Sequence, residues 1–547
     1  MRPRHLLLLS LVAFTGCDPS AKCDTLNTWF EDRDVDGFGT DAVVEQTCGD
    51  APSGYVATGG DCDDRDAAVF PGAAEVCGDG KVNDCGADAA EVVAACTVSG
   101  EVTASVGSGA VVQGAATDAA GSAVASAGDV DGDDVQELLV GAPGAAGGAG
   151  EAWLYYGGDD GALEADDSWV RFIGESVGDE AGAALAGLGD LNSDGDSDIG
   201  VGAPGADGEA GRAYIILQDL DNDLPLADAD LVFTGANAGD RAGAAIAGVG
   251  DFNGDDALDV AIGAPGADDS TGRVYLITAI TDGAYDLADA TRVLTGLAAG
   301  SEVGAALLGM DLTGDGDMDL VVGAPGAALS ADPGEDDVYP GAVYAYLENF
   351  VTETSLQEAE IKLNGDMDES RAGTTIKNLG DVTGDGYDDL GIGAPRVGFG
   401  GTRTGSVYVM AGPVEALTYR VLRDVSYARL DGVSADDRAG VSVEGPGDVD
   451  GDGLDDILVG APDEGSELEG RGAVYLAYGP ISASTSDGTD LTIASVIYTG
   501  EEAGAALGTA LAGVGDQDNN GTAEILAGAP GAGSGAGAAY LLRAAGY

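Results

Sequence analysis

Along most of the chain, short aliphatic runs alternate with turns rich in Asp and Gly, and the alternation is periodic. From residue 448 the sequence reads DVDGDGLDDILVGAP, in which an acidic turn leads into an aliphatic run that Gly-Ala-Pro ends. Short β-branched and aliphatic runs between turn residues are typical of β-strands. Copies of this stretch, 60–70 residues apart, begin at Asp129, Asp190, Asp251, Asp311, Asp381, Asp448 and Asp516. We number their acidic turns loop 1 to loop 7 and expect a repeat architecture.

One repeat unit, residues 171–217, indicates which strands each copy contributes. Four short strands separated by Gly-rich turns are predicted, at Arg171–Gly174, Ala183–Gly187, Ile199–Gly202 and Ala213–Leu217. A sheet this small cannot bury both faces alone, so neighbouring sheets must stack. The predicted fold class is all-β, with a seven-bladed β-propeller over residues 111–547 that follows a small, loop-rich, disulfide-rich module.

The two ends of the repeat array predict how the ring closes. Residues 111–131 align with the stretch that begins at Arg171, so the first copy starts with a strand of a preceding blade. The last copy ends in LLRAAGY and lacks that strand. We therefore expect Val111–Gly114 to complete the seventh blade, which removes an exposed sheet edge.

The acidic turns have the composition of a Ca²⁺ site, because Ca²⁺ takes roughly six to eight oxygen ligands from carboxylates and carbonyls. Oxygen-bearing side chains recur at turn positions 1, 3, 5 and 9, and position 7 is included for its backbone carbonyl. The predicted metal ligands, loop by loop, are Asp129, Asp131, Asp133, Val135, Glu137; Asp190, Asn192, Asp194, Asp196, Asp198; Asp251, Asn253, Asp255, Ala257, Asp259; Asp311, Thr313, Asp315, Asp317, Asp319; Asp381, Thr383, Asp385, Tyr387, Asp389; Asp448, Asp450, Asp452, Leu454, Asp456; and Asp516, Asp518, Asn520, Thr522, Glu524. Up to seven Ca²⁺ ions are expected in the propeller.

An EF-hand does not fit these turns, because position 12 is apolar in every copy and Gly-Ala-Pro leaves no exiting helix. An alternative stays open, in which Asp and Gly serve only the conformation of the turns. Loops 1 and 6 carry four carboxylates and should bind best. Asn520 at position 5 and Glu524 at position 9 make loop 7 the expected weakest site.

Charge narrows the possible partners. The chain has 97 Asp plus Glu against 22 Lys plus Arg, a formal net charge of −75. Nucleic acid and anionic membrane surfaces are disfavoured as partners, because binding to either needs a basic footprint.

The only histidine is His5, inside the expected leader. The mature protein would therefore lack His-activated nucleophiles and His-ligated zinc or copper.

The N-terminus predicts export. Residues 1–16 carry two arginines, an apolar run and small residues, as a signal peptide does. The segment 14–17 resembles a bacterial lipobox with Cys17 as the lipidated residue, but Phe14 departs from the usual aliphatic residue, so ordinary cleavage stays open. Six further cysteines precede residue 97 and are expected to form disulfides of undetermined pairing: Cys23, Cys48, Cys62, Cys77, Cys85 and Cys96.

Two family resemblances complete these predictions. The segments DRDVDGFG, GDCDD, PGAAEVC and NDC of residues 17–96 resemble the MopE-type metal-binding motif. Its metal candidates here are Asp32, Asp34, Asp36, Asp61 and Asp63. A disulfide knot with an acidic rim is the alternative for this module. After a linker at 97–110, the seven Gly-Ala-Pro copies resemble the FG-GAP repeat, the propeller of integrin α-subunits and many bacterial surface proteins. The Phe of "FG" is replaced by Ala or Val before Gly182, Gly243, Gly304, Gly373, Gly440 and Gly504.

The function that these features predict is non-enzymatic. We expect a Ca²⁺-binding bacterial surface protein, a monomeric lipoprotein of the outer membrane or cell surface, that binds a protein or glycan in adhesion or recognition. Recognition is expected on the rim opposite the acidic loops, where the longer insertions Ala328–Pro340 and Arg396–Thr404 lie. The alternatives are a carbohydrate-active hydrolase or lyase on a propeller scaffold, and a passive spacer or coat protein.

Overall fold

The computed structural model describes residues 27–33, 38–47, 51–61, 100–104 and 108–543, the last range with short gaps. The chain divides into two compact units, of which Ser99–Ala544 is the larger. In the first unit, four strands form one sheet in the order β3-β1-β2-β4. These strands are β1 (Asn27–Glu31), β2 (Gly39–Thr47), β3 (Tyr55–Val56) and β4 (Gly59–Asp61). The expected leader, Cys17 and the six other cysteines lie outside the described residues.

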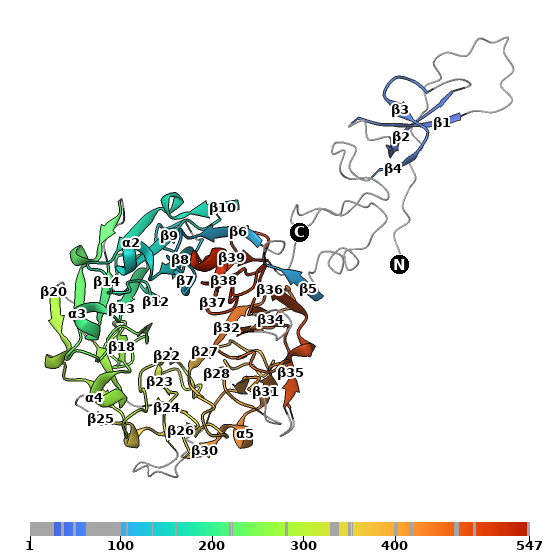
Figure 1. The fold of residues 1–547 in the computed structure, drawn as a ribbon. Helices are drawn as coiled ribbons and strands as arrows, with labels where there is room; N and C mark the ends of the chain where they lie inside the picture. The colour runs from blue at the N-terminus through green and yellow to red at the C-terminus, as the bar shows by residue number, and fades with distance from the viewer. Residues whose placement is uncertain are drawn as a thin grey trace, which may run out of the picture. The chain divides into compact units, whose positions relative to one another are not determined.

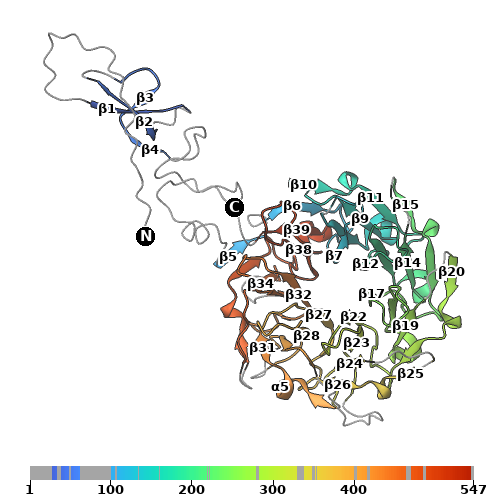
Figure 2. The ribbon, with the colours of Figure 1, turned by 180° about the vertical axis from the view of Figure 1, so that it is seen from behind.

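The larger unit is a ring of seven sheets, seen from its two sides in Figures 1 and 2, and each sheet is one blade. The innermost strand of each blade, written first below, lines the centre of the ring. The first four strands of each blade are, for blade 1, β7 (Ala123–Gly128), β8 (Glu137–Ala142), β9 (Glu151–Tyr155) and β11 (Val170–Ile173); for blade 2, β12 (Ala184–Gly189), β13 (Asp198–Ala203), β14 (Arg212–Ile216) and β16 (Leu231–Thr234); for blade 3, β17 (Ala245–Gly248), β18 (Val260–Ala264), β19 (Arg273–Ile277) and β21 (Val293–Thr295); for blade 4, β22 (Ala306–Met310), β23 (Asp319–Ala324), β24 (Ala342–Tyr346) and β26 (Ile361–Asn364); for blade 5, β27 (Thr375–Asn378), β28 (Leu390–Ala394), β29 (Ser406–Met410) and β31 (Ala428–Asp431); for blade 6, β32 (Ser442–Gly447), β33 (Asp456–Ala461), β34 (Ala473–Ala477) and β36 (Val496–Thr499); and for blade 7, β37 (Leu511–Gly513), β38 (Ile525–Ala529), β39 (Ala538–Leu542) and β6 (Ser108–Gln113).

The first four strands of each blade pair antiparallel, as they do in blade 2. The unit predicted from residues 171–217 contains its four predicted strands, but the first of them pairs with β9 in the sheet of blade 1. Its strands are β11, β12, β13 and β14, each within two residues of the predicted bounds. The helical segments described in the propeller are short. The α-helical ones are α2 (Ala145–Gly148), α3 (Ala206–Glu209), α4 (Ala267–Ser270), α5 (Leu422–Val425) and α6 (Ala532–Gly535), and the 3₁₀ turns are η1 (Ala165–Asp167), η2 (Leu226–Asp228), η3 (Leu287–Asp289), η4 (Leu356–Glu358) and η5 (Leu491–Ile493). The propeller is therefore an all-β fold, as predicted.

Each sheet has five strands rather than the four that the sequence predicts. The fifth pairs parallel with the outer strand and in most blades comes from the following repeat, as β15 does with β11. The fifth strands of blades 1 to 7 are β15 (Leu224–Pro225), β20 (Gly283–Asp286), β25 (Thr354–Ser355), β30 (Arg420–Val421), β35 (Thr489–Asp490), β5 (Gly100–Thr103) and β10 (Gly161–Glu164). A strand of two to four residues covers an edge that would otherwise be exposed, yet it is too short to show a hydrophobic period.

The ring closes through the N-terminal segment, as predicted. Strand β6 pairs antiparallel with β39, with Val112 opposite Ala539 and Gln113 opposite Ala538. The preceding strand β5 pairs parallel with β36 of blade 6. This pairing corrects the expected linker at 97–110, because Gly100–Thr103 belongs to a sheet. The N-terminal segment thus supplies one strand to blade 6 and one to blade 7.

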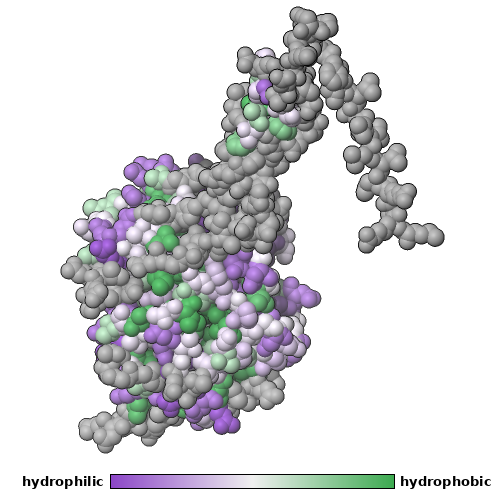
Figure 3. Space-filling view, turned by 90° about the vertical axis from the view of Figure 1, so that its right-hand side faces the viewer, coloured by the Kyte–Doolittle hydropathy of each residue, from purple (hydrophilic) through white to green (hydrophobic). Residues whose placement is uncertain are grey.

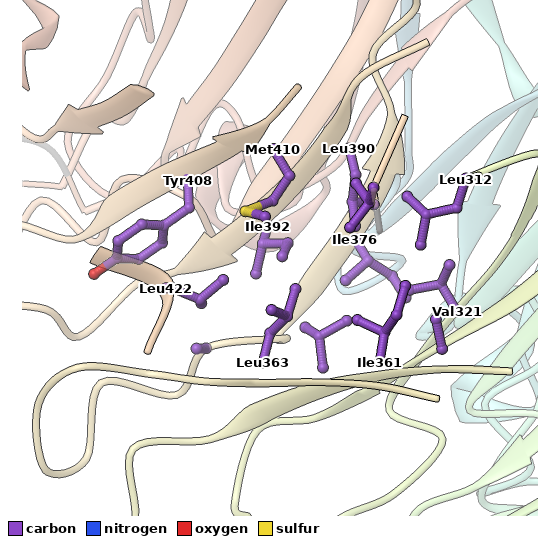
Figure 4. Close-up of a cluster of buried hydrophobic side chains, with 14 of the residues drawn as sticks. Leu312, Val321, Ile361, Leu363, Ile376, Leu390, Ile392, Tyr408, Met410 and Leu422 are labelled. Carbon is purple, nitrogen blue, oxygen red and sulfur yellow. The ribbon is translucent and has the colours of Figure 1, made fainter. Parts of the chain in front are cut away.

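The hydrophobic core is divided among the seams between blades. In the cluster drawn in Figure 4, Val321 and Leu363 of blade 4 pack with Ile392 and Tyr408 of blade 5, and all four are at most 1% exposed. Equivalent clusters join blades 1 and 2, 2 and 3, 3 and 4, 5 and 6, and 7 and 1. Because each sheet buries its faces only against its neighbours, the stability of the ring depends on the whole set of blades.

One glycine shows why the blades approach so closely. Gly182 has φ +82°, and a Cβ there would lie 2.2 Å from the Glu151 carbonyl oxygen of the preceding blade. Its N–H donates to the Gly202 carbonyl. In blade 7 the same hydrogen bond is made by Gly508, not by Gly504, and Leu507 precedes it. The glycine of "FG" in the last copy is therefore Gly508, four residues after the predicted Gly504.

The two rims of the propeller carry different loops. The acidic loops connect the first and second strands of each blade, and the Gly-Ala-Pro segments connect the second and third. Because these strands are antiparallel, the two sets of loops lie on opposite rims. We call the rim that carries the Gly-Ala-Pro segments the Gly-Ala-Pro rim. In the side view of Figure 3, the described propeller surface mixes hydrophilic residues and residues of intermediate hydropathy, with several hydrophobic areas between them.

Candidate metal centres

Loop 6 shows how the local backbone arranges the acidic side chains. The Asp448 carboxylate accepts the N–H groups of Gly451 at 2.6 Å, Asp452 at 3.1 Å and Gly453 at 2.8 Å. Asp450 accepts the N–H of Asp452 at 3.1 Å. Positive φ angles at Gly451 and Gly453 allow this tight turn. The turn therefore holds the carboxylates at positions 1 and 3 in place before any ion binds.

The same backbone hydrogen bonds recur in all seven loops. The carboxylate at position 1 accepts at least two N–H groups from positions 4 to 6 in each copy. The side chain at position 5 accepts the N–H of the predicted position-7 residue: Val135, Asp196, Ala257, Asp317, Tyr387, Leu454 or Thr522. Repetition of the 1-3-5-9 pattern in sequence thus produces one repeated geometry.

Position 9 carries a buried carboxylate in every loop. The exposed fraction is 3% or less at Glu137, Asp198, Asp259, Asp319, Asp389, Asp456 and Glu524. Each accepts an N–H from position 2 or 3 of its own loop, as Asp456 does from Val449 at 2.9 Å. Asp456 also accepts the Gly479 N–H at 2.8 Å, which ties the loop to the third strand.

Burial shifts the ionisation of these carboxyl groups. Burial, reinforced by the neighbouring aspartates, raises the pKa of Asp456 to about 7. The same causes raise the pKa of Glu137 and of Glu524 to about 7. Burial likewise raises the pKa of Asp198, Asp319 and Asp389 to about 6, and that of Asp259 in the same direction. A nearby cation would favour the charged form of each group, so a bound metal would lower these pKa values and stabilise the buried carboxylates.

In three loops the carboxylates at positions 1, 3 and 9 converge. One oxygen of each lies within 4.8 Å of the others in loop 1 (Asp129, Asp131, Glu137), loop 6 (Asp448, Asp450, Asp456) and loop 7 (Asp516, Asp518, Glu524). Position 5 is not part of these groups. Loops 6, 7 and 1 belong to consecutive blades around the closure of the ring. The geometry groups loop 7 with the two loops expected to bind best, although its residue types suggest the weakest site.

The other four loops have a neutral residue at position 3. Asn253 donates to Asp259 at 3.0 Å, and Asn192 donates to Asp194 and to the Leu217 carbonyl, both at 2.9 Å. Thr383 Oγ1 lies 3.4 Å from Asp389. Thr313 Oγ1 is buried with no hydrogen-bond partner among the described residues. An orphaned hydroxyl oxygen beside a buried carboxylate fits a loop whose oxygens face a hard cation.

Neighbouring loops contact one another along this rim. The Ser197 N–H of loop 2 donates to the Asp129 carbonyl of loop 1 at 3.0 Å. The Asp381 N–H of loop 5 donates to Asp455 of loop 6 at 2.8 Å. Hydrogen bonds therefore link loop 1 to loop 2 and loop 5 to loop 6 on this face of the ring.

Two residues that the motif did not identify belong to this rim. Gln517, at position 2 of loop 7, is 2% exposed and donates to the Gln136 carbonyl of blade 1 at 3.0 Å. Arg543, after the third strand of blade 7, lies with its Nε 3.4 Å from Asp518. The sequence could have singled out Gln517, because it is polar at position 2, where the other six copies have an apolar residue.

The candidates of the N-terminal module are only partly described. Asp32 is 8% exposed, and its N–H donates to the Gly54 carbonyl at 2.9 Å. Asp61 ends strand β4, and its side chain lies outside the described part. Asp34, Asp36 and Asp63 lie outside the described residues. Across the part of the chain that the structure describes, no helix is long and apolar enough to cross a membrane.

A ring of seven blades, each with a buried carboxylate in an acidic loop, defines the protein class as a seven-bladed β-propeller with candidate metal loops. Comparison with known protein families gives two matches. The FG-GAP repeat model matches six segments: 120–155, 181–216, 242–277, 303–346, 378–410 and 441–476. The MopE-type metal-binding motif matches residues 61–91. Blades 1 to 6 therefore carry FG-GAP repeats. Blade 7 lies beyond the six matches and repeats their strand order.

Relatives of known identity are integrin α-subunits. The chain is 32% identical to integrin alpha-4 of Xenopus laevis over 218 residues, which is 39% of this chain and 19% of that protein. It is 34% identical to integrin alpha-PS2 of Drosophila melanogaster over 217 residues, 39% of this chain and 14% of the relative. With integrin alpha pat-2 of Caenorhabditis elegans it shares 30% identity over 225 residues, 39% and 17% of the two chains. The chain thus spans less than a fifth of the length of these relatives.

Proposed function

We propose that this protein is a non-enzymatic, Ca²⁺-binding surface protein whose propeller recognises a protein or glycan. The observation that carries the metal assignment is the convergence of three carboxylates in loops 1, 6 and 7. Oxygen-only ligands on a compact turn favour Ca²⁺ over softer metals, and extracellular modules bind it with a Kd of roughly 10⁻⁴–10⁻³ M. A bound ion would fix the turn and offset the charge of the buried position-9 carboxylate.

Calcium titration of the full chain tests the metal assignment. We expect bound Ca²⁺ in equilibrium dialysis, and a melting temperature that rises with millimolar Ca²⁺ and falls with EDTA. Mg²⁺ is the control, because it demands near-octahedral geometry and keeps several waters. An unchanged melting temperature together with no bound Ca²⁺ would overturn the assignment.

We place recognition on the Gly-Ala-Pro rim, opposite the acidic loops. Its loops vary in length from blade to blade, and Ala328–Pro340 and Arg396–Thr404 are the longer insertions. Similarity to integrin α-subunits supports a role in adhesion or recognition. Three carboxyl groups whose pKa is raised to about 7, Glu137, Asp456 and Glu524, lie in the metal loops, which supports binding rather than turnover. Binding without turnover on a glycan array and in protein capture is the expected result, and hydrolysis or cleavage of a glycan would favour the enzyme.

We also propose that the protein is exported and anchored through lipidated Cys17 as a monomer. The support is the leader pattern of residues 1–16 and the six cysteines that precede the repeats. Mass spectrometry of the mature N-terminus tests it directly. A lipid-modified Cys17 is expected as the mature N-terminal residue, and Cys17→Ser should abolish this modification.

A further inference from the structure

Arg543 occupies a position that contacts a metal loop in blades 2 and 7. It directly follows the third strand of blade 7, and the equivalent residues elsewhere are all uncharged: Tyr156, Leu217, Thr278, Leu347, Ala411 and Tyr478. Contacts with loop position 3 are visible in two blades. In blade 2 the Leu217 carbonyl accepts from Asn192 at 2.9 Å, and in blade 7 the Arg543 Nε lies 3.4 Å from Asp518 Oδ2.

The Arg543 guanidinium is held between the metal loop and the closing strand. A Cβ built on Gly109 of β6 would lie 2.6 Å from the Arg543 Cζ, so the guanidinium covers this glycine directly. The pairing of β6 with β39 shifts register at the same place, where Leu541 faces Ala110 and Leu542 faces Ser108. The Arg543 side chain is 22% exposed, and its Nε is buried without a hydrogen-bond partner among the described residues.

We propose that Arg543 is an internal counter-ion of loop 7, which competes with a bound cation for Asp518 and connects this loop to the closing strand. The inference rests on the proposed metal binding. Without metal, the guanidinium offsets part of the negative charge that Asp516, Asp518 and Glu524 bring together. With a divalent cation in the loop, the two positive charges repel each other and share one carboxylate.

The consequence is a difference between sites that have the same carboxylates. Loops 6 and 7 both bring three carboxylates together, but Tyr478 stands in blade 6 where Arg543 stands in blade 7. Loop 7 therefore binds a divalent cation more weakly than loop 6, on the order of tenfold for a unit charge near the ion at moderate screening. The cause is the neighbouring arginine rather than Asn520.

The test compares Arg543→Gln with a matched charge deletion. Arg273→Gln removes an arginine of similar exposure that pairs with Asp268 on the Gly-Ala-Pro rim, 2.8 Å from Nη2 to Oδ2. Calcium is titrated calorimetrically into the full chain, and the transition of loop 7 is the one that Asp516→Asn removes. We expect Arg543→Gln to raise the affinity of that transition about tenfold and to lower the melting temperature in EDTA. Arg273→Gln should leave the affinity unchanged.

Three further variants keep the test decisive if Arg543→Gln folds poorly. Arg543→Lys keeps the charge and should retain the wild-type affinity. Gly109→Ala displaces the guanidinium without changing the net charge and should also tighten loop 7. Tyr478→Arg transfers the counter-ion to loop 6 and should weaken that site about tenfold. Wild-type protein that binds Ca²⁺ while Arg543→Gln and Tyr478→Arg titrate like Arg273→Gln would overturn this inference. Wild-type protein that binds no Ca²⁺ would instead overturn the proposed function.

Discussion

The Gln517 side chain donates to the Gln136 carbonyl at 3.0 Å, which joins the last blade of the ring to the first across 381 residues of sequence. The Gly158 N–H of blade 1 donates back to the Gln517 Oε1 at 3.1 Å. In the other six loops this position is apolar, so its side chain cannot form such a pair of hydrogen bonds. The seam where the ring closes thus has a polar connection beside its metal loops.

Replacing Gln517 should weaken the closure seam. Gln517→Leu matches the other repeats in hydrophobicity but leaves the Gln136 carbonyl and the Gly158 N–H without their partner. We expect a loss of about 1–3 kcal/mol in the free energy of unfolding. Urea denaturation measures it, with Leu312→Met in loop 4 as the control for altered packing at the same position. Equal stability of the two variants would contradict the role given to these hydrogen bonds.

The buried carboxylate of loop 6 offers a test of one metal site at a time. Asp456→Asn keeps the size of the side chain but removes the charge, so it should abolish binding at that loop and lower the number of bound Ca²⁺ by one. In EDTA the variant should be at least as stable as the wild type, because burying a carboxylate is unfavourable. Dialysis and thermal melts with and without Ca²⁺ measure both effects. Asp463→Asn, outside the acidic loops, serves as the control.

The raised pKa values predict how stability depends on pH without metal. The folded-state pKa lies at about 7 for Glu137, Asp456 and Glu524, above the ordinary value near 4 in the unfolded chain. The folded state therefore binds more protons between these values, and the stability that this binding contributes is lost as the pH rises through about 7. In EDTA we expect higher stability at pH 5.5 than at pH 8.

Saturating Ca²⁺ should reverse this trend, because the ion binds the charged carboxylates and protons compete with it. Urea unfolding at pH 5.5, 6.5 and 8 in EDTA and in Ca²⁺ measures both slopes. The triple variant of Glu137→Gln, Asp456→Asn and Glu524→Gln should flatten both. Stability in EDTA that increases from pH 5.5 to pH 8 would contradict the prediction.

The closing strand provides two adjacent positions with opposite environments. Val112 of β6 is 2% exposed and packs in the cluster between blades 7 and 1, whereas Gln113 faces solvent. Val112→Asp buries an unpaired carboxylate and should cost more than about 3 kcal/mol. Gln113→Asp should change the free energy of unfolding by less than about 0.5 kcal/mol. Guanidinium denaturation followed by tryptophan fluorescence, with Trp153 in that cluster, measures the difference.

Much of this fold could be predicted from local sequence. The strands around loop 2 and the closure by Val111–Gly114 follow from a hydrophobic pattern that repeats with similar spacing from copy to copy. The 1-3-5-9 spacing also anticipated that Asp448, Asp450 and Asp456 approach one another. These features are local, so the sequence contains their signal.

The features that the sequence did not predict depend on residues distant in the chain. The fifth strands have two to four residues, too few to show a period, and they form only because the outer strand of a neighbouring blade is available. Gly100–Thr103 resembled a linker for the same reason. The contact of Arg543 with Asp518 and Gly109 requires the ring to be closed, which no local pattern reports.

The fifth strands have a practical consequence for cutting this chain. Because β15 completes the sheet that β11 belongs to, a fragment ended at the last residue of one repeat lacks part of its own outer edge. Truncated versions for expression should therefore extend through the donated strand, and a start after Thr103 would leave blade 6 one strand short. When a repeat is added or removed, each outer strand keeps its fifth-strand partner only if the new junction retains the segment that pairs with the preceding blade, as β15 pairs with β11.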